Sequence, residues 1–322
     1  MKTKQECSGE YQHYPGNDPR IRFVLPAHDR PRGVVAETSI DQLLPEVRSL
    51  YGLAHLGAKI AFYQDATRYD DPRYNHNQVQ ASRDLIAAID VCEREGRVFK
   101  GGLFGPMASG KDSASHNLRR GVTFRGELKG RFQLVRHNLD LGRYSGIVYT
   151  QGGVKMGLVP TYKSLEDLIK QSANFPPTTL LVINEFIFAG GTGEKEITED
   201  NFRAFLKIME DREIHTLFVG LDLDFKLDPW PNILVALPHL DHLAVLSARC
   251  NERGCRNVAH FTERRRPILR SGQLSYVPCR MSDEVVKVGT VVKNLVQEGK
   301  DQYGSKCQKH HRVYAPAYKI SL

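Results

Sequence analysis

The stretch GPMASGKD, residues 105–112, combines two glycines and a lysine in the spacing of a phosphate-binding loop. It fits the pattern G-x-x-x-x-G-K-[ST] at Gly105, Gly110 and Lys111, and it has Asp112 where the pattern requires a hydroxyl. Such loops cradle phosphates with backbone N–H groups and a lysine, while the hydroxyl oxygen holds Mg²⁺. An aspartate adds a negative charge beside a polyanion. The stretch is therefore a decayed loop, a chance match, or a working site with rearranged ligands.

A second group that could do chemistry follows the apolar run TLLVI, residues 179–183, which ends at Asn184 and Glu185. An acidic residue at this position is typical of the metal-associated strand that faces a phosphate-binding loop. Acidic residues also end strands at turns and helix caps, so Glu185 alone decides nothing. Gly105, Glu185 and Asp222 all follow expected strands, and ligands of parallel α/β sheets bind beyond those strand ends.

The elements that must position these residues alternate along the chain. Apolar runs predict strands over 97–104, 132–135, 179–183 and 216–221. Ser164 is expected to cap the helix of SLEDLIK, and Thr198 a helix that buries Phe202, Phe205, Leu206 and Met209. Strands that alternate with helices predict a mainly parallel α/β sheet.

The first 95 or so residues match no motif. Ser39 and Gln42 resemble a capping box before an amphipathic helix, and a second helix is expected over 78–95. The role of this extension cannot be inferred from its sequence.

Composition is that of an ordinary globular protein, with 41% hydrophobic and 25% charged residues among 322. No apolar stretch approaches the roughly 18 residues of a membrane span, and the N-terminus lacks an apolar signal core, so we expect a cytoplasmic protein without a membrane partner. The net charge of +8 indicates either a solvated basic face or attraction for nucleotide phosphates. We do not expect nucleic acid as a partner.

Four of the six cysteines lie in the last quarter of the chain, which favours metal binding over disulfides. The pairs Cys250-x4-Cys255 and Cys307-x2-His310 supply four ligands across a long loop, as a structural Zn²⁺ site requires. Four protein ligands leave no open coordination position on the metal. The ion would therefore hold a loop in place and would not catalyse a reaction. Cys279 as a substitute ligand, or free thiols, are the alternatives.

The order of motifs resembles the type II thymidine kinase family over about residues 98–311. The segments are GPMASGK, SLEDLI, INEFIF, GLDLDFKLDPW, SARC and DQYGSKCQKHH. The family patterns read approximately GPMFSGKS/T, SLEDL, IDEAQFF, GLDxDFxxxPF, TAxCxxC and DKYxxxCRxHH. The resemblance implies a deoxynucleoside kinase that transfers the ATP γ-phosphoryl group to a 5′-hydroxyl. Thymidine is the expected acceptor, Mg²⁺ would accompany ATP, and a homotetramer is expected.

The resemblance also implies residue roles. Glu185 would be the base that deprotonates the nucleoside hydroxyl. The base pocket would be walled by Met107, Phe188, Leu221, Phe225 and Trp230, and core packing is the alternative explanation for each of these five. Tyr303 would lie over the nucleoside from the C-terminal lasso. The ATP phosphates would be bound through Gly105, Pro106, Met107, Ala108, Ser109, Gly110, Lys111, Asp112, Asp140, Arg143 and Asn184. Asp140 and Arg143 match their family motif only with one extra residue between them.

The implied fold is a P-loop NTPase-type sheet with a small C-terminal zinc-binding lasso and a partly helical N-terminal extension. The expected divisions are an extension over 1–96, a kinase domain over 97–246, a lasso over 247–311 and a tail over 312–322.

Four residues depart from the family around the chemistry: Asp112, Asn184, Ile187 and Gln151. At Asp112 and Asn184 the departures are complementary, because the carboxylate moves to the loop and the neutral group to the facing strand. The pair keeps one negative charge and one neutral oxygen, so we hypothesise an exchange of Mg²⁺ ligands. The competing interpretation is a non-catalytic nucleotide-binding scaffold, and a third is another P-loop activity such as a nucleic-acid-dependent ATPase.

Overall fold

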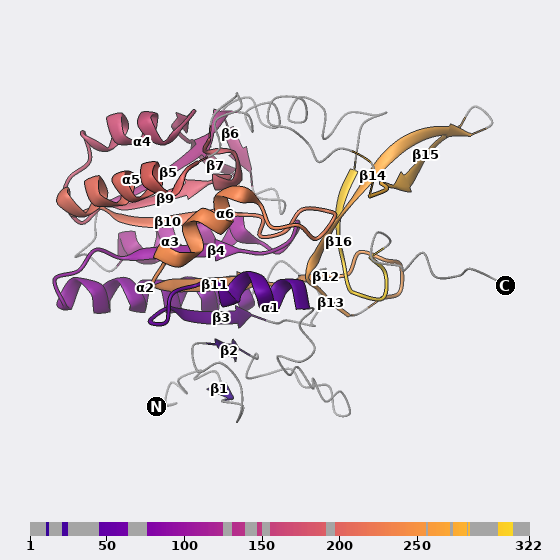
Figure 1. The fold of residues 1–322 in the computed structure, drawn as a ribbon, viewed down its shortest axis with the longest axis horizontal. Helices are drawn as coiled ribbons and strands as arrows, with labels where there is room; N and C mark the ends of the chain where they lie inside the picture. The colour runs from indigo at the N-terminus through magenta and orange to yellow at the C-terminus, as the bar shows by residue number, and fades with distance from the viewer. Residues whose placement is uncertain are drawn as a thin grey trace, which may run out of the picture.

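A computed structural model describes residues 11–12, 21–24, 45–63, 76–124, 131–138, 147–149, 155–190, 197–255, 257–270, 273–281, 283 and 302–311. Within these residues the central feature is a nine-stranded sheet (Figure 1). In spatial order its strands are β1 (Tyr11–Gln12), β2 (Ile21–Val24), β3 (Lys59–Tyr63), β11 (His242–Leu246), β4 (Lys100–Phe104), β10 (His215–Gly220), β9 (Leu180–Asn184), β5 (Phe132–His137) and β8 (Thr161–Tyr162). All neighbouring strands are parallel except β1 and β2.

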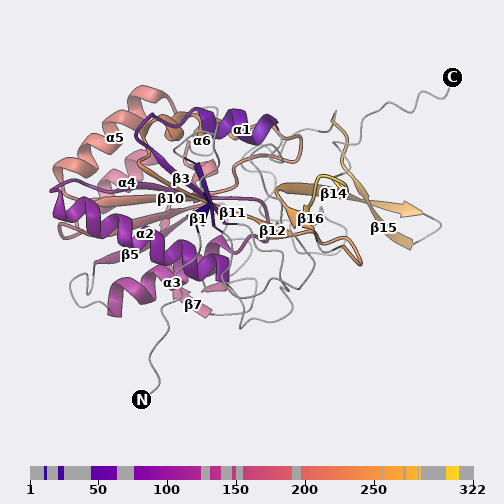
Figure 2. The same ribbon diagram turned by 90° about the horizontal axis from the view of Figure 1, so that it is seen from below.

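Helices cover both faces of this sheet (Figure 2). The helices α2 (His76–Arg94) and α3 (Lys111–Phe124) pack on one face. The opposite face carries α1 (Pro45–Gly52), α4 (Leu165–Ser172), α5 (Glu199–Asp211) and α6 (Pro231–Ala236). This is the doubly covered α/β architecture of a P-loop NTPase-type sheet, as predicted. No helix in the described part of the chain is both long enough and apolar enough to cross a membrane.

The local signals for the kinase-like part are confirmed. Ser164 caps α4 by accepting a hydrogen bond from the Asp167 N–H, and Thr198 caps α5 in the same way through the Asn201 N–H. The first expected strand begins at Lys100 rather than Arg97, because residues 95–97 turn back onto the end of α2. The predicted capping residues Ser39 and Gln42 lie outside the described residues.

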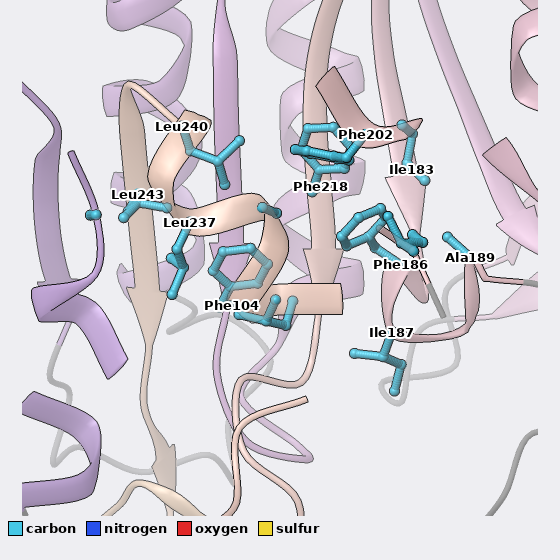
Figure 3. Packing of buried hydrophobic residues seen from close by; sticks show 14 of the residues in the cluster. Phe104, Ile183, Phe186, Ile187, Ala189, Phe202, Phe218, Leu237, Leu240 and Leu243 are labelled. Atoms are coloured by element: carbon cyan, nitrogen blue, oxygen red, sulfur yellow. The ribbon is translucent and has the colours of Figure 1, made fainter. Parts of the chain in front are cut away.

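Aromatic side chains fill the core beneath α5 and α6 (Figure 3). The ring of Phe186 lies 4.6 Å from that of Phe218, and Phe202 contacts both rings. Phe186 and Ile187 belong to a short 3-10 turn, η3 (Phe186–Phe188), directly after β9. Ile187, at a position where the family has glutamine, is buried in this core. Its side chain therefore contributes packing rather than a polar contact.

Part of the N-terminal segment belongs to the central sheet. Strand β3 pairs in parallel with β11, with Ile60 opposite Leu243, and α2 packs along α3. The packing is close, because a Cβ at Gly121 of α3 would lie 2.4 Å from the Ile86 side chain of α2. The described segments 45–63 and 76–94 thus pack into the hydrophobic clusters on both faces of the sheet together with the P-loop part, and packing is continuous across the division expected near residue 96.

The C-terminal part forms small sheets beside the strand ends of the central sheet. Strands β12 (Ala248–Arg249) and β13 (Val258–Ala259) pair, and β14 (Phe261–Arg270) lies between β15 (Gln273–Pro278) and β16 (Gln302–Lys306). The β14–β15 hairpin extends away from the body of the molecule in both ribbon views. A separate pair, β6 (Ile147–Tyr149) and β7 (Lys155–Leu158), is antiparallel, and η4 (Leu237–His239) follows α6.

Candidate active site and metal cluster

The glycine loop lies between the end of β4 and the start of α3. Gly105 has φ of +145°, and a Cβ at this position would lie 2.2 Å from the carbonyl oxygen of Leu246. Gly110 has φ of +85°, and its Cβ would meet the side chain of Gln78 at 2.3 Å. Both glycines are therefore required by conformation and by close approach. Ala108 also has a left-handed φ of 61°, so the loop has the irregular backbone of a phosphate-binding turn at a helix N-terminus.

Lys111 lies folded over this loop. Its Nζ donates to the carbonyl oxygens of Gly105 at 2.9 Å and Pro106 at 2.8 Å. Burial lowers the pKa of Lys111, and the nearby carboxylates of Glu185, then Asp222 and Asp112, oppose that shift. The ammonium is therefore held at the strand ends among acidic groups. A polyphosphate bound in the loop would contact it there.

Asp112 and Asn184 are in direct contact. The Asn184 Nδ2 donates to Asp112 Oδ1 at 2.9 Å, and Asn184 Oδ1 accepts the Glu185 N–H at 3.0 Å. The second Asp112 oxygen pairs with Arg136 at 3.5 Å. Arg136 is almost fully buried near the end of β5, so Asp112 balances a charge that the protein has removed from water. The two departures from the family pattern thus form one hydrogen-bonded pair.

Glu185 has a strained backbone. Its φ of 56° and ψ of 41° place a non-glycine residue in the left-handed region, at a cost of about 1–3 kcal/mol. The turn is fixed on both sides. Tyr162 donates to the Asn184 carbonyl at 3.0 Å, and the buried Asn232 amide donates to the carbonyls of Phe186 and Ile187. Strain of this kind clusters at active sites and ligand-binding turns.

Asp222 follows β10, and its side chain is buried close enough to Lys111 for their charges to interact. Its Oδ2 accepts a hydrogen bond from Tyr51 of α1 at 3.0 Å, and its Oδ1 accepts the Leu223 N–H. Burial raises the pKa of Asp222, while the hydrogen bond from Tyr51 and the charge of Lys111 lower it. The backbone carbonyl of Asp222 also accepts the Trp230 N–H at 3.2 Å, which closes the loop between them.

The lasso reaches the glycine loop and the expected nucleoside pocket through one strand, β14. Its Thr262 hydroxyl accepts the Met107 N–H at 3.0 Å. Two residues on, the Arg264 guanidinium lies 5.5 Å from the centre of the Phe225 ring, and Arg264 pairs in register with Tyr303 of β16. Three residues expected at the nucleoside pocket, Met107, Phe225 and Tyr303, are therefore linked by the same strand.

The remaining expected pocket residues lie on the neighbouring loops. Phe188 and Trp230 contact edge to face, with ring centres 6.1 Å apart, and both are partly buried against the core. Leu221, directly after β10, is also partly buried against it. Among the described residues, the buried indole N–H of Trp230 has no hydrogen-bond partner. These contacts are compatible with a nucleobase site and with core packing alike.

The four expected zinc ligands come together. The ligand atoms of Cys250, Cys255, Cys307 and His310 all lie within 4.8 Å of one another. The His310 Nδ1 is 3.5 Å from Cys250 Sγ and 3.4 Å from Cys307 Sγ, and the sulfurs of Cys255 and Cys307 are 3.9 Å apart. Tetrahedral Zn²⁺ with bonds of about 2.0–2.3 Å sets its ligand atoms about 3.5–3.8 Å apart, so this donor set fits the ion.

The wide spacing of the first pair has a local explanation. The Cys255 N–H donates to the Glu252 carbonyl, and Gly254 adopts a φ of +77°, so the two extra residues are absorbed in a tight turn. Cys279, the alternative ligand, is buried outside the cluster, and its N–H donates to the Arg264 carbonyl. Burial, followed by the neighbouring Cys250, raises the pKa of the Cys307 thiol to about 11. A bound cation would supply the charge that favours its thiolate.

Some expected residues cannot be placed, and others were missed. Asp140, Arg143 and Gln151 lie outside the described residues. Sequence reasoning missed Arg136, although it directly follows the strand expected over 132–135, and a place just after an expected strand is the signal that identified Glu185. It also missed Thr262 and the N-terminal partners Tyr51 and Gln78, for which no local signal exists.

Comparison with known proteins identifies the family. The thymidine kinase family profile matches residues 102–311. The thymidine kinase of Thermococcus kodakarensis is 26% identical over 215 residues, covering 66% of this chain and 92% of that protein. The thymidine kinase of Deinococcus deserti is 25% identical over 212 residues, covering 66% of this chain and 93% of that protein.

Among solved structures, the chain is similar to the RuvB Holliday junction branch migration motor of Thermotoga maritima. The match covers 52% of this chain and 44% of that one, at 15% identity and a TM-score of 0.32. The family profile spans the glycine loop, the Glu185 turn and the metal cluster together. The chain therefore belongs to the thymidine kinase family.

Proposed function

We propose that the protein transfers the γ-phosphoryl group of ATP to the 5′-hydroxyl of a deoxynucleoside, with thymidine as the acceptor. The observation that carries this proposal is the convergence of Lys111 and Glu185 at the ends of nearby strands, within the region that matches the thymidine kinase profile. We place the reaction in the cytoplasm, and a homotetramer stays a prediction of the sequence.

The glycine loop would hold the ATP phosphates. Backbone N–H groups of residues 105–111 and the Lys111 ammonium would neutralise charge on the β- and γ-phosphates. Asp140 and Arg143 keep their proposed phosphate role. Because phosphoryl transfer depends mainly on positioning and electrostatics, a rigid loop contributes directly to the rate.

Glu185 would act on the acceptor. Its carboxylate would accept the proton of the 5′-hydroxyl while that oxygen forms a bond to the γ-phosphorus. The bond from the γ-phosphorus to the β,γ-bridging oxygen breaks, ADP leaves, and a nucleoside 5′-monophosphate remains. The left-handed turn at Glu185 suits this task because it ends the regular strand β9 and fixes the backbone from which the carboxylate projects.

Asp112 and Asn184 would hold Mg²⁺ with ATP. A carboxylate and an amide are the oxygen donors that this ion prefers, and both lie beside Lys111. When bound, the ion would neutralise charge on the β- and γ-phosphates. The hydrogen bond from Asn184 and the ion pair with Arg136 fix the orientation of the Asp112 carboxylate.

The nucleoside base would lie among Met107, Phe188, Leu221, Phe225, Trp230 and Tyr303. The partly buried rings of Phe188 and Trp230 offer apolar faces, and the Trp230 indole offers a donor for a base carbonyl. The lasso strand β14 would hold this pocket against the glycine loop through Thr262 and Met107.

Phosphorylation of thymidine by purified protein with Mg·ATP tests the proposal. We expect ADP and thymidine 5′-monophosphate to form in equal amounts, and Lys111→Ala to abolish the reaction. Hydrolysis of ATP that does not depend on a nucleoside would indicate another P-loop activity. Binding of Mg·ATP and thymidine without product would favour the scaffold interpretation, which rests on the four departures from the family pattern.

Zinc is the second proposed metal, held by Cys250, Cys255, Cys307 and His310 as a structural ion. We expect about one Zn²⁺ per chain in freshly purified protein. Cys307→Ser should release the ion and weaken thymidine binding about tenfold, because β16 leads directly from Tyr303 to the cluster. Cys279→Ser is the matched control and should keep the metal. Metal analysis that finds no zinc in the native protein would contradict the proposal.

A further inference from the structure

The segment that precedes the family match contributes side chains to the site. Residues 45–94 lie before the matched region of 102–311, yet their polar side chains reach two of its functional loops. Among the buried polar residues of the chain are Gln78 and Ser82 of α2, which have helical i, i+4 spacing on the side that faces α3. Gln78 forms a hydrogen bond to the glycine loop, and Tyr51 forms one to Asp222, at the start of the loop that ends at Trp230.

Gln78 holds the backbone of the glycine loop. Its Nε2 donates to the Ser109 carbonyl at 2.9 Å, and its side chain lies flat against Gly110. Because the peptide between Ser109 and Gly110 is planar and trans, fixing the carbonyl toward α2 turns the Gly110 N–H to the opposite side. Ser82 adds a contact one turn further, donating to the Ala114 carbonyl of α3 at 2.9 Å.

Tyr51 holds the second loop. Its hydroxyl donates to Asp222 at 3.0 Å, and both side chains are buried. Asp222 in turn accepts N–H groups at both ends of the loop that carries Phe225 and ends at Trp230. The ring of Tyr51 is fixed by edge-to-face contact with Phe62 of β3. The hydroxyl therefore reaches Asp222 from a rigid position.

We propose that the segments 45–63 and 76–94 support the active site, in which Gln78 positions the phosphate-binding loop and Tyr51 positions the nucleoside loop. Both are positioning residues, since neither touches the reacting atoms. The role of Tyr51 rests on the kinase function proposed above, because it requires a bound nucleoside. The role of Gln78 requires only that the chain binds ATP.

Two isosteric substitutions separate these roles. Gln78→Met removes the donor and keeps the length of the side chain, and Tyr51→Phe removes the hydroxyl alone. Each has a matched control in the same segment. Gln80 donates to Asp84 on α2, and Tyr63 donates to Asp84 at 2.8 Å, away from both loops. Gln80→Met and Tyr63→Phe therefore remove bonds of the same kind without touching the site.

The readouts are Mg·ATP affinity by calorimetric titration, thymidine affinity, and the thermal unfolding midpoint. Gln78→Met should weaken Mg·ATP binding about threefold to tenfold, the scale of one hydrogen bond, and leave thymidine affinity near the wild-type value. Tyr51→Phe should show the reverse selectivity, with thymidine weakened about threefold to tenfold. The two controls should leave the affinities for Mg·ATP and for thymidine near the wild-type values, whatever their effect on the unfolding midpoint.

Unchanged Mg·ATP affinity in Gln78→Met, unchanged thymidine affinity in Tyr51→Phe, or equal losses for both ligands in all four variants would overturn the inference. The segments 45–63 and 76–94 would then be a purely structural addition. Failure of the proposed function has a different signature. If the wild-type chain binds Mg·ATP but phosphorylates no nucleoside, the function is wrong, and the comparison of Gln78→Met with Gln80→Met alone decides the inference. If the wild-type chain is active and Gln78→Met binds Mg·ATP normally, the inference is wrong and the function stands.

Discussion

Replacing Glu185 by glutamine should lower kcat for thymidine phosphorylation by about 10²-fold or more, the scale of a general-base contribution. The amide has the size of the carboxylate but cannot accept the proton of the 5′-hydroxyl. Mg·ATP affinity should change little, because Glu185 acts on the acceptor and its side chain is not part of the Asp112–Asn184 pair. Steady-state kinetics together with calorimetric titration of Mg·ATP measure the two quantities separately.

The chain offers a matched control for this substitution. Glu213, which follows α5, has the same left-handed backbone as Glu185, with φ of 55°, but it is exposed and far from the strand ends that form the site. Glu213→Gln therefore tests whether the substitution itself disturbs a strained turn. We expect this control to keep full activity. Near-normal turnover of Glu185→Gln would mean that another group is the base, or that positioning alone drives the transfer.

The parts of the fold that follow from local sequence were predictable. Helix caps such as Ser164 and Thr198 are set by hydrogen bonds within three residues, and buried strands such as β9 are short apolar runs. The role of β3 was not predictable, because KIAFY pairs with β11 across about 180 residues of chain. A short apolar run can indicate a strand, but it does not identify the strand with which it pairs.

The candidate site likewise contains residues that the sequence predicts and residues that it does not. Motif residues such as Lys111 and Glu185 lie at strand ends, where a parallel sheet must place them. Their partners were missed because the contacts are long-range. Gln78 reaches Ser109 across 31 residues, and Tyr51 reaches Asp222 across 171. The metal cluster was predictable despite its long separation, because cysteine and histidine restrict the chemistry in a way that tyrosine and glutamine do not.

The Asp112–Asn184 pair should respond to substitution as one unit. Asp112→Ser removes the carboxylate that balances the buried Arg136, and Asn184→Asp places a second carboxylate where an amide now donates at 2.9 Å. Each single change should weaken Mg·ATP binding by roughly 10-fold to 100-fold, since each leaves a charge without its partner. The double substitution restores one carboxylate and one neutral group, in the family order, and should recover much of the affinity.

A double-mutant cycle measured with and without Mg²⁺ identifies what couples the two residues. Contacting groups have coupling energies of about 0.5–3 kcal/mol, so a positive result is well above the few tenths expected for independent sites. If the pair shares the ion, the coupling should be larger for Mg·ATP than for ATP alone. The coupling could instead be the same for Mg·ATP and for ATP alone, and the unfolding midpoints of the four proteins could show the same non-additivity. That result would mean that Asp112 and Asn184 only support Arg136. Additive effects would contradict the exchange altogether. Asp112 would then be a defect in the loop, and the scaffold interpretation would gain over the kinase.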